Sequence, residues 1–97
     1  MAIQVGRYSF DGPFGSVDQL RDASGVYVVL CGPTNVVTDV GESHSVRTRV
    51  QNHDRAPCWR AHCSNTLNVA VLYVAEVDRM RIESELRDQF RPACGMR

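Results

Sequence analysis

The sequence predicts an α+β fold, with helices flanking a small three-stranded antiparallel sheet and a short extension at the N-terminus. Three observations predict this class. Two apolar, β-branched runs are separated by the turn sequence Gly32-Pro33-Thr34-Asn35, as expected for a hairpin. A third such run, 68–75, follows a stretch of helical periodicity, and a longer amphipathic stretch comes last. At 97 residues, the whole chain (1–97) is expected to form one domain.

The first half of the chain contains the N-terminal extension and the hairpin. Aromatic residues around Asp11-Gly12-Pro13 indicate a strand or arm followed by a turn. Ser16 and Gln19 have the spacing of a capping box, which predicts a brief helix over 16–22. The strands of the hairpin are predicted over 26–31 and 36–40.

A helix is predicted from about Ser43 to His53, because apolar residues recur there at helical spacing. The residues that share this face are Val46, Val50 and His53. Either Ser43 or Ser45 can act as the N-cap. A short helical turn over 58–63 is predicted after Pro57.

The last predicted helix begins near Asp78, which can cap it, and ends before Pro92. Its apolar stripe consists of Ile82, Leu86 and Phe90. The predicted order of the core elements is therefore strand, strand, helix, strand, helix.

The composition excludes several classes of protein. An apolar fraction of 43% is too high for an extended disordered chain. The longest apolar runs, 26–31 and 69–75, fall short of the roughly 20 residues of a membrane helix, so no membrane partner is expected. No signal-peptide pattern follows Met1, which predicts a cytoplasmic protein. The four cysteines are accordingly expected to be reduced thiols; they are Cys31, Cys58, Cys63 and Cys94.

The charge balance restricts any nucleic-acid surface to one part of the chain. Eleven basic and eleven acidic side chains give a formal net charge of zero, whereas generic duplex binding depends on a basic footprint. The only concentrated positive stretch is 44–63, which contains four arginines and a single acidic residue, Asp54. These arginines are Arg47, Arg49, Arg55 and Arg60.

Four residues carry polar groups at positions where packing favours apolar ones: Tyr27, Arg49, His53 and Glu83. Each has an ordinary structural interpretation, including a salt bridge from Glu83 to Arg79 or Arg87. Together they suit phosphodiester hydrolysis. A carboxylate can hold a divalent cation, a guanidinium can neutralise charge on a phosphate, and a phenol or imidazole can position a water.

The tripeptides 25–27 (GVY) and 39–41 (DVG) resemble the motif pair of the GIY-YIG nuclease family. In that family an arginine lies eight residues after the second motif, frequently with a histidine four residues further, as Arg49 and His53 do here. The family's metal-binding glutamate precedes a leucine by three residues and a proline by nine, which matches Glu83. The predicted order of elements is also that of the family's core.

This resemblance covers about residues 25–95 and implies a metal-dependent endonuclease acting on DNA. Tyr27 would orient or deprotonate the attacking water with help from His53, and Arg49 would bind the scissile phosphate. Glu83 would ligate one Mg²⁺ or Mn²⁺ ion, and the products would carry a 5′ phosphate and a 3′ hydroxyl. Further substrate contacts are expected from Arg47, Arg55, Trp59 and His62.

The sequence departs from the family pattern at two positions. Asp39 stands where the second motif normally begins with tyrosine, and Gly95 stands where many members carry asparagine. Asp39 is predicted as an additional catalytic carboxylate on the sheet face of Tyr27, which requires an odd number of residues in the hairpin loop. The alternative is a weak or inactive GIY-YIG-like domain that binds nucleic acid or protein.

A zinc-binding module is a further alternative, because four zinc-capable side chains occur within eleven residues. They are His53, Cys58, His62 and Cys63, and their spacing lies outside the common zinc patterns. For the nuclease interpretation, a length of 97 residues predicts a single domain without a separate DNA-reading domain beside it. Specificity is therefore expected from DNA shape, a homodimer or a partner protein.

Overall fold

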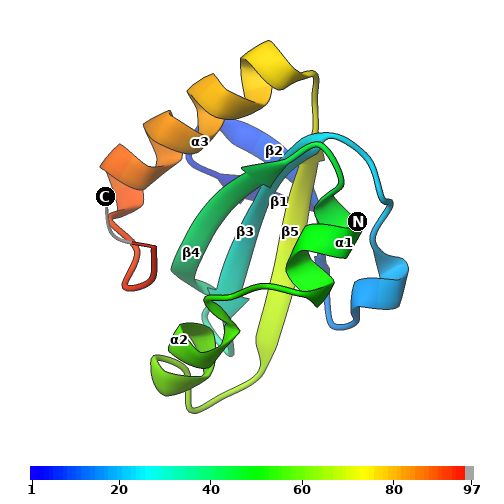
Figure 1. The fold of residues 1–97 in the computed structure, drawn as a ribbon. Coiled ribbons are helices and arrows are strands. Elements are labelled where there is room, and N and C mark those ends of the chain that lie inside the picture. Colours follow the sequence, from blue (N-terminus) through cyan, green and yellow to red (C-terminus); the bar gives the residue numbers. More distant parts are fainter. Residues whose placement is uncertain (96–97) are drawn as a thin grey trace.

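A computed structural model describes residues 1–95, in which five strands form one antiparallel sheet in the order β1-β2-β5-β3-β4 (Figure 1). The strands are β1 (Ala2–Val5), β2 (Tyr8–Phe14), β3 (Gly25–Cys31), β4 (Val36–Ser43) and β5 (Leu67–Tyr73). The helices are the 3₁₀ turn η1 (Val17–Gln19), α1 (Val46–Gln51), α2 (Ala56–Ala61) and α3 (Glu76–Phe90).

The prediction of a three-stranded sheet is wrong, because the N-terminal segment contributes two strands. β1 and β2 form a hairpin with Ile3 opposite Phe10, and β2 pairs with β5 through Asp11 and Val71. The Asp-Gly-Pro sequence, predicted as a turn, lies inside β2 where its register with β5 shifts. A proline cannot donate a hydrogen bond to a sheet, so it is tolerated at such an irregularity.

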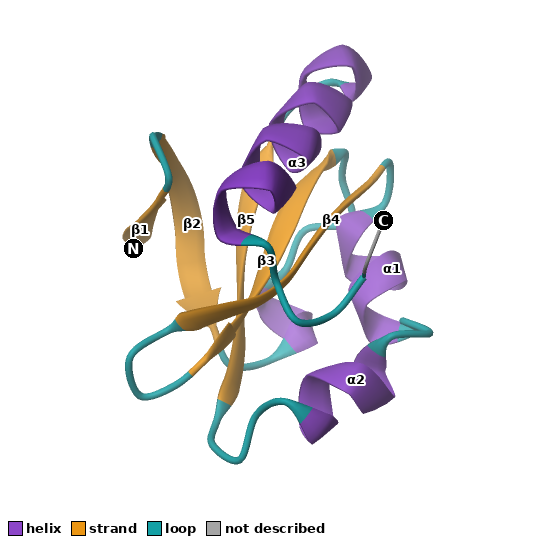
Figure 2. Cartoon of the chain, turned by 90° about the vertical axis from the view of Figure 1, so that its left-hand side faces the viewer, coloured by secondary structure: helices purple, strands orange, loops and turns teal. Residues whose placement is uncertain are grey.

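Each face of the sheet is covered by helices (Figures 1 and 2). α3 packs on one face, and α1, α2 and η1 lie on the other. Successive side chains of a strand point to opposite faces, so the central strand β3 contributes to both layers. Val26 packs with Leu86 of α3, whereas Tyr27 and Val29 pack with Val50 of α1. Tyr27 is therefore held between the sheet and the α1–α2 layer.

The helix boundaries differ from the predicted ones by a few residues. α1 ends at Gln51, so His53 lies in the connection between α1 and α2. Pro57 does not interrupt a helix but lies in the first turn of α2, a position that proline tolerates. α3 begins at Glu76, and Asp78 lies in its first turn, where an acidic group favours the helix dipole. None of the helices in residues 1–95 combines the length and the apolar composition needed to cross a membrane.

The prediction of reduced cysteines is also wrong, since the described part of the chain contains two disulfides. Cys31 at the end of β3 is bonded to Cys63, and Cys58 of α2 is bonded to Cys94 near the C-terminus. The bonded residues are 32 and 36 positions apart, with Cα atoms separated by 5.7 and 5.9 Å. Four cysteines allow three pairings, and only spatial proximity selects between them. The disulfides connect the α2 region to the sheet and to the C-terminal segment.

Candidate active site

Tyr27 lies opposite Gly41 of β4, and its ring crosses directly over that glycine. A Cβ atom at position 41 would overlap the phenol ring and its oxygen. At position 25, a Cβ would lie 2.6 Å from the backbone oxygen of Leu72 on the neighbouring strand. Both tripeptide motifs therefore need their glycine for a steric reason. Gly41 leaves room for the phenol of Tyr27, and Gly25 lets strand β5 approach closely.

His53 contacts Tyr27 directly. The phenol oxygen lies 2.5 Å from Nε2, and the imidazole is fully buried. Nδ1 of His53 accepts a hydrogen bond of 3.0 Å from the backbone N–H of Arg55. In a neutral ring the proton is then assigned to Nε2, which donates to the phenol oxygen. The connection between α1 and α2 thus fixes the tautomer of the histidine.

Burial controls the ionisation of this pair. It lowers the pKa of His53 to about 4, and the nearby guanidinium groups of Arg49 and Arg55 act in the same direction. Burial also raises the pKa of Tyr27, although the same two arginines oppose that change. Near neutral pH the imidazole and the phenol are therefore both uncharged.

The lowered pKa of His53 predicts that the protein becomes less stable in mild acid. The pKa rises from about 4 in the folded chain to about 6.5 in the unfolded chain, so the unfolded state binds the extra proton first. The His53 contribution to the free energy of unfolding is complete above about pH 6.5 and is lost progressively as the pH falls towards 4. Urea unfolding at about pH 7.5 and about pH 5 measures the change.

His53→Gln is expected to remove this part of the pH dependence, whereas His44→Gln at an exposed position is expected to retain it. The same pH dependence in wild type and His53→Gln would contradict the prediction.

Asp39 lies on the same sheet face as Tyr27, as predicted, but for a different reason. The hairpin loop, 32–35, has four residues, and this even number would place the two side chains on opposite faces of a regular ladder. A bulge in β4 adds Thr38 as one extra residue and reverses the alternation. Asp39 is consequently paired with Val29, two residues beyond Tyr27 on the same face.

The carboxylate of Asp39 is completely buried and is surrounded by protein donors. Oδ2 accepts hydrogen bonds from Nε of Arg55 at 2.8 Å and from the indole N–H of Trp59 at 2.7 Å. Oδ1 accepts one from Nη2 of Arg87 at 2.7 Å and one from the backbone N–H of Val40 at 2.8 Å. These donors stabilise a charge that burial would otherwise disfavour. They also occupy both oxygens that the predicted catalytic role of Asp39 would use.

Glu83 is connected to Asp39 through a buried arginine. Oε2 of Glu83 lies 3.2 Å from Nε of Arg87, one helical turn further along α3. The side chains of Glu83 and Arg87 are 17% and 7% exposed, so solvent reaches the carboxylate but hardly the guanidinium. The salt bridge considered as the structural interpretation of Glu83 is therefore present, and it orients the carboxylate.

The sequence predicts Arg87 only as a possible salt-bridge partner of Glu83. Its position one turn after a carboxylate, beside the apolar stripe of α3, was the sequence signal for its burial.

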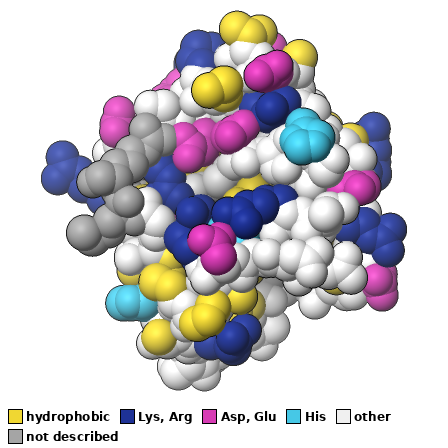
Figure 3. All heavy atoms as spheres, viewed as in Figure 1, with side chains coloured by type: hydrophobic (Ala, Val, Ile, Leu, Met, Phe, Trp, Pro, Cys, Tyr) yellow, Lys and Arg dark blue, Asp and Glu magenta, His cyan; other side chains and the backbone are white. Residues whose placement is uncertain are grey.

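The arginines of the basic stretch lie around the Tyr27–His53 pair and towards solvent. Nη2 of Arg49 is 2.8 Å from Asp54, and the Arg49 side chain is 37% exposed. Arg47 is 43% exposed and forms a looser pair, 3.5 Å long, with Asp18. In Figure 3 basic side chains gather near the centre of this face, close to a row of acidic ones. The surface beside the site thus carries several arginines, and Arg47 and Arg49 are each paired with an aspartate.

Of the residues predicted to contact the substrate, Trp59 is buried and His62 is exposed. Trp59 is only 6% exposed, and its indole packs against His53 with ring centroids 4.6 Å apart. The tryptophan therefore supports the imidazole and Asp39, and little of it is open to a stacking base. His62 ends α2 and is exposed, so the structure does not bring it into the buried cluster.

The zinc alternative is wrong, because both of its cysteines are disulfide-bonded, each to a different partner. Within residues 1–95, no group of three or more His, Cys, Asp and Glu side chains is arranged to hold a metal ion. A divalent ion at Glu83 would complete its coordination with water and phosphate oxygens, which Mg²⁺ commonly does.

Comparisons with known proteins add no relative to this picture. No protein-family model matches the chain, and no curated protein matches it closely enough to be a relative. The functional interpretation consequently depends on the geometry of the site and on the motif resemblance.

Proposed function

We propose that this protein is a GIY-YIG-type endonuclease that hydrolyses DNA phosphodiester bonds with a divalent metal ion. The observation that carries the proposal is the contact of 2.5 Å between Tyr27 and His53, which are 26 residues apart in the sequence. Motif spacing does not require these side chains to meet. Arg49 on α1 lies close enough to the pair to influence the pKa of both groups. Phenol, imidazole and guanidinium thus form one cluster.

Tyr27 is assigned to orienting the attacking water. Burial raises the pKa of its phenol, so the neutral hydroxyl is the dominant form near neutral pH. His53 is a hydrogen-bond donor to the phenol oxygen, and the positive charge of Arg49 acts to lower the pKa of the phenol. The hydroxyl hydrogen can then point to the oxygen of a water molecule. Arg49 also supplies the positive charge that stabilises the phosphate in the transition state.

Glu83 is the proposed protein ligand of Mg²⁺ or Mn²⁺. Its carboxylate is reached by solvent and is oriented by Arg87, as ligating carboxylates commonly are by a neighbouring donor. One carboxylate suffices for Mg²⁺, which usually retains water and binds phosphate oxygens of the substrate. The ion would stabilise the charge on the departing 3′ oxygen.

DNA is the proposed partner because the arginines of the basic stretch lie on the face of the sheet that carries Tyr27. Arg47, Arg49 and Arg60 have exposed guanidinium groups on the face that carries Tyr27. Arginine suits the bidentate recognition of phosphate. One such site cuts one strand, so a homodimer or a partner protein would supply the second cut and the sequence specificity.

A cytoplasmic location remains part of the proposal, and one observation weighs against it. Disulfides persist mainly in oxidising compartments and are rare in the cytosol of most organisms, whereas this chain contains two.

The purified protein is expected to nick supercoiled plasmid DNA in Mg²⁺ or Mn²⁺ and to stop when EDTA is added. Glu83→Ala and Arg49→Ala are each expected to reduce the initial rate by about a hundredfold or more, since each removes charge stabilisation from the reacting phosphate. Glu76→Ala, at an exposed glutamate of the same helix, is the matched control and is expected to retain activity. Equal rates for wild type and Glu83→Ala would contradict catalysis by this site.

The second candidate is a domain that binds nucleic acid or protein without cutting. The occupation of both Asp39 oxygens by arginine and tryptophan donors favours this candidate, because the second motif then contributes no reactive group. Salt-sensitive DNA binding without nicking in either metal would support it.

A further inference from the structure

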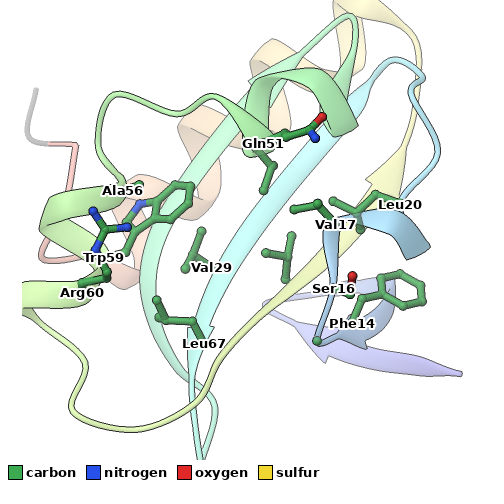
Figure 4. A pocket seen from close by; sticks show the side chains of 13 residues that line it. Phe14, Ser16, Val17, Leu20, Val29, Gln51, Ala56, Trp59, Arg60 and Leu67 are labelled. Carbon is green, nitrogen blue, oxygen red and sulfur yellow. The ribbon is translucent and has the colours of Figure 1, made fainter.

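A groove on the α1–α2 face lies beside the proposed active site and has no role in the proposed chemistry. Its volume is about 300 Å³, at the lower end of the range for ligand pockets. In Figure 4, Trp59 and Arg60 form one end and Phe14 and Leu20 the other, with Val29 between them. The groove therefore extends from α2 across the sheet to η1.

Two residues belong to both the groove and the active-site cluster. Val29 lines the groove and lies two residues beyond Tyr27 on the same face of β3. Trp59 lines the groove and packs against His53. A ligand in the groove would consequently touch the immediate neighbours of the Tyr27–His53 pair.

The side chains of the groove define the chemistry of its ligand. The lining is predominantly apolar and includes Val17, Val50, Leu67 and Val69. Gln51 adds an amide that can donate and accept hydrogen bonds. Arg60 is the only charged residue in the lining; it is exposed and forms no ion pair within residues 1–95. The groove thus offers an apolar surface, one amide and one guanidinium, without any acidic group.

We propose that this groove binds one nucleobase of a nucleic acid whose phosphate lies at the Tyr27–His53 site. The inference rests on the proposed function and extends it by naming a base-binding subsite. The ring of the base would pack on the apolar lining, Gln51 would bond to its polar edge, and Arg60 would pair with a flanking phosphate. Arg60, which has no ion-pair partner within residues 1–95, is a positive group in the lining, and it favours a ligand that carries phosphate over an apolar peptide.

The single tryptophan of the chain, Trp59, provides a direct readout because it lines the groove. Its fluorescence is measured while two single-stranded trinucleotides are added in EDTA, so that binding is observed without cleavage. The two have the same phosphates, and one lacks the central base. The complete trinucleotide is expected to quench the fluorescence and to bind about tenfold more tightly than the abasic one, because only its central base buries apolar surface in the groove.

Variants on the two faces of the sheet separate the groove from general charge effects. Arg60→Gln is expected to weaken both trinucleotides by roughly threefold or more, because it removes one phosphate contact. Arg81→Gln changes an exposed arginine on α3, across the sheet, and is expected to change neither affinity. Val69→Phe is expected to fill the groove and to abolish the difference between the two trinucleotides. If Val69→Phe does not fold, the comparison of Arg60→Gln with Arg81→Gln still tests the proposal.

Equal affinity for the complete and abasic trinucleotides would overturn the inference. Two other results would also overturn it: a dimer of this chain that buries the groove, and tighter binding of an apolar peptide than of the complete trinucleotide. The outcome is independent of catalysis. Base-dependent quenching in a protein that does not nick DNA would refute the proposed nuclease but support the base-binding groove. Nicking without base dependence would refute the groove alone.

Discussion

Tyr27→Phe is expected to abolish nicking of plasmid DNA while leaving the fold intact. The substitution removes only the hydroxyl that contacts His53 at 2.5 Å and keeps the ring that crosses Gly41. Loss of a group that positions or deprotonates water typically reduces a rate by about a hundredfold to ten-thousandfold. Initial nicking rates with excess protein in Mg²⁺ measure this effect. The unpaired Nε2–H of His53 is expected to lower the free energy of unfolding by only about 1–3 kcal/mol.

Tyr8→Phe is the matched control. The Tyr8 hydroxyl bonds to Glu85 at 2.7 Å, in the layer of α3 on the other side of the sheet. This variant removes the same atom from the same type of residue and is expected to nick at the wild-type rate. Full activity of Tyr27→Phe would show that the phenol takes no part in the reaction, and would leave the non-catalytic binding domain as the better interpretation.

Asp39→Ala is expected to lower the free energy of unfolding by about 3–5 kcal/mol, the usual cost of leaving a buried charge without its partner. Arg87, whose side chain is 7% exposed, would lose its bond to Oδ1, and the indole N–H of Trp59 would lose its acceptor. Arg55 reaches the same carboxylate and would lose two contacts. The midpoint of urea unfolding measures the effect.

Asp18→Ala removes an aspartate that is 80% exposed and lies 3.5 Å from Arg47. As an exposed pair it is expected to change the free energy of unfolding by less than about 1 kcal/mol. Unfolding of Asp39→Ala at the wild-type urea concentration would contradict the structural role of Asp39. Asp39→Tyr introduces the tyrosine of the family motif, but we expect it to destabilise the fold as much as Asp39→Ala does. A larger neutral ring must then enter a filled site, Arg55 loses its ion pair with Asp39, and Arg87 keeps only its pair with Glu83.

Local patterns were sufficient for most of the central elements. The apolar runs predicted the three strands β3, β4 and β5 within three residues at each end, because strands buried on both faces are almost continuously apolar. The capping box of Ser16 and Gln19 is present, although the turn it begins ends at Gln19. In both cases the signal comes from residues that are neighbours in the sequence.

The N-terminal strands and the disulfides could not be predicted in the same way. β2 contains Gly12 and Pro13, whose local preference is for a turn, and only pairing with β5 overrides that preference. The cysteine pairs are 32 and 36 residues apart, and their proximity follows from the packing of α2 against the sheet. Non-local contacts decide both features.

In the candidate site, too, some features follow from the local sequence and others from contacts between distant residues. The sequence by itself determined which reactive groups the chain carries, whereas the steric need for Gly41 beneath the Tyr27 ring is seen only in the structure. Spacing also predicted that Arg49 and His53 would lie near each other. Only the tertiary structure decided what Asp39 does, because one bulged residue in β4 sets its face and two distant arginines occupy its oxygens. A buried carboxylate takes its role from the charges packed around it, and packing is a property of the whole fold.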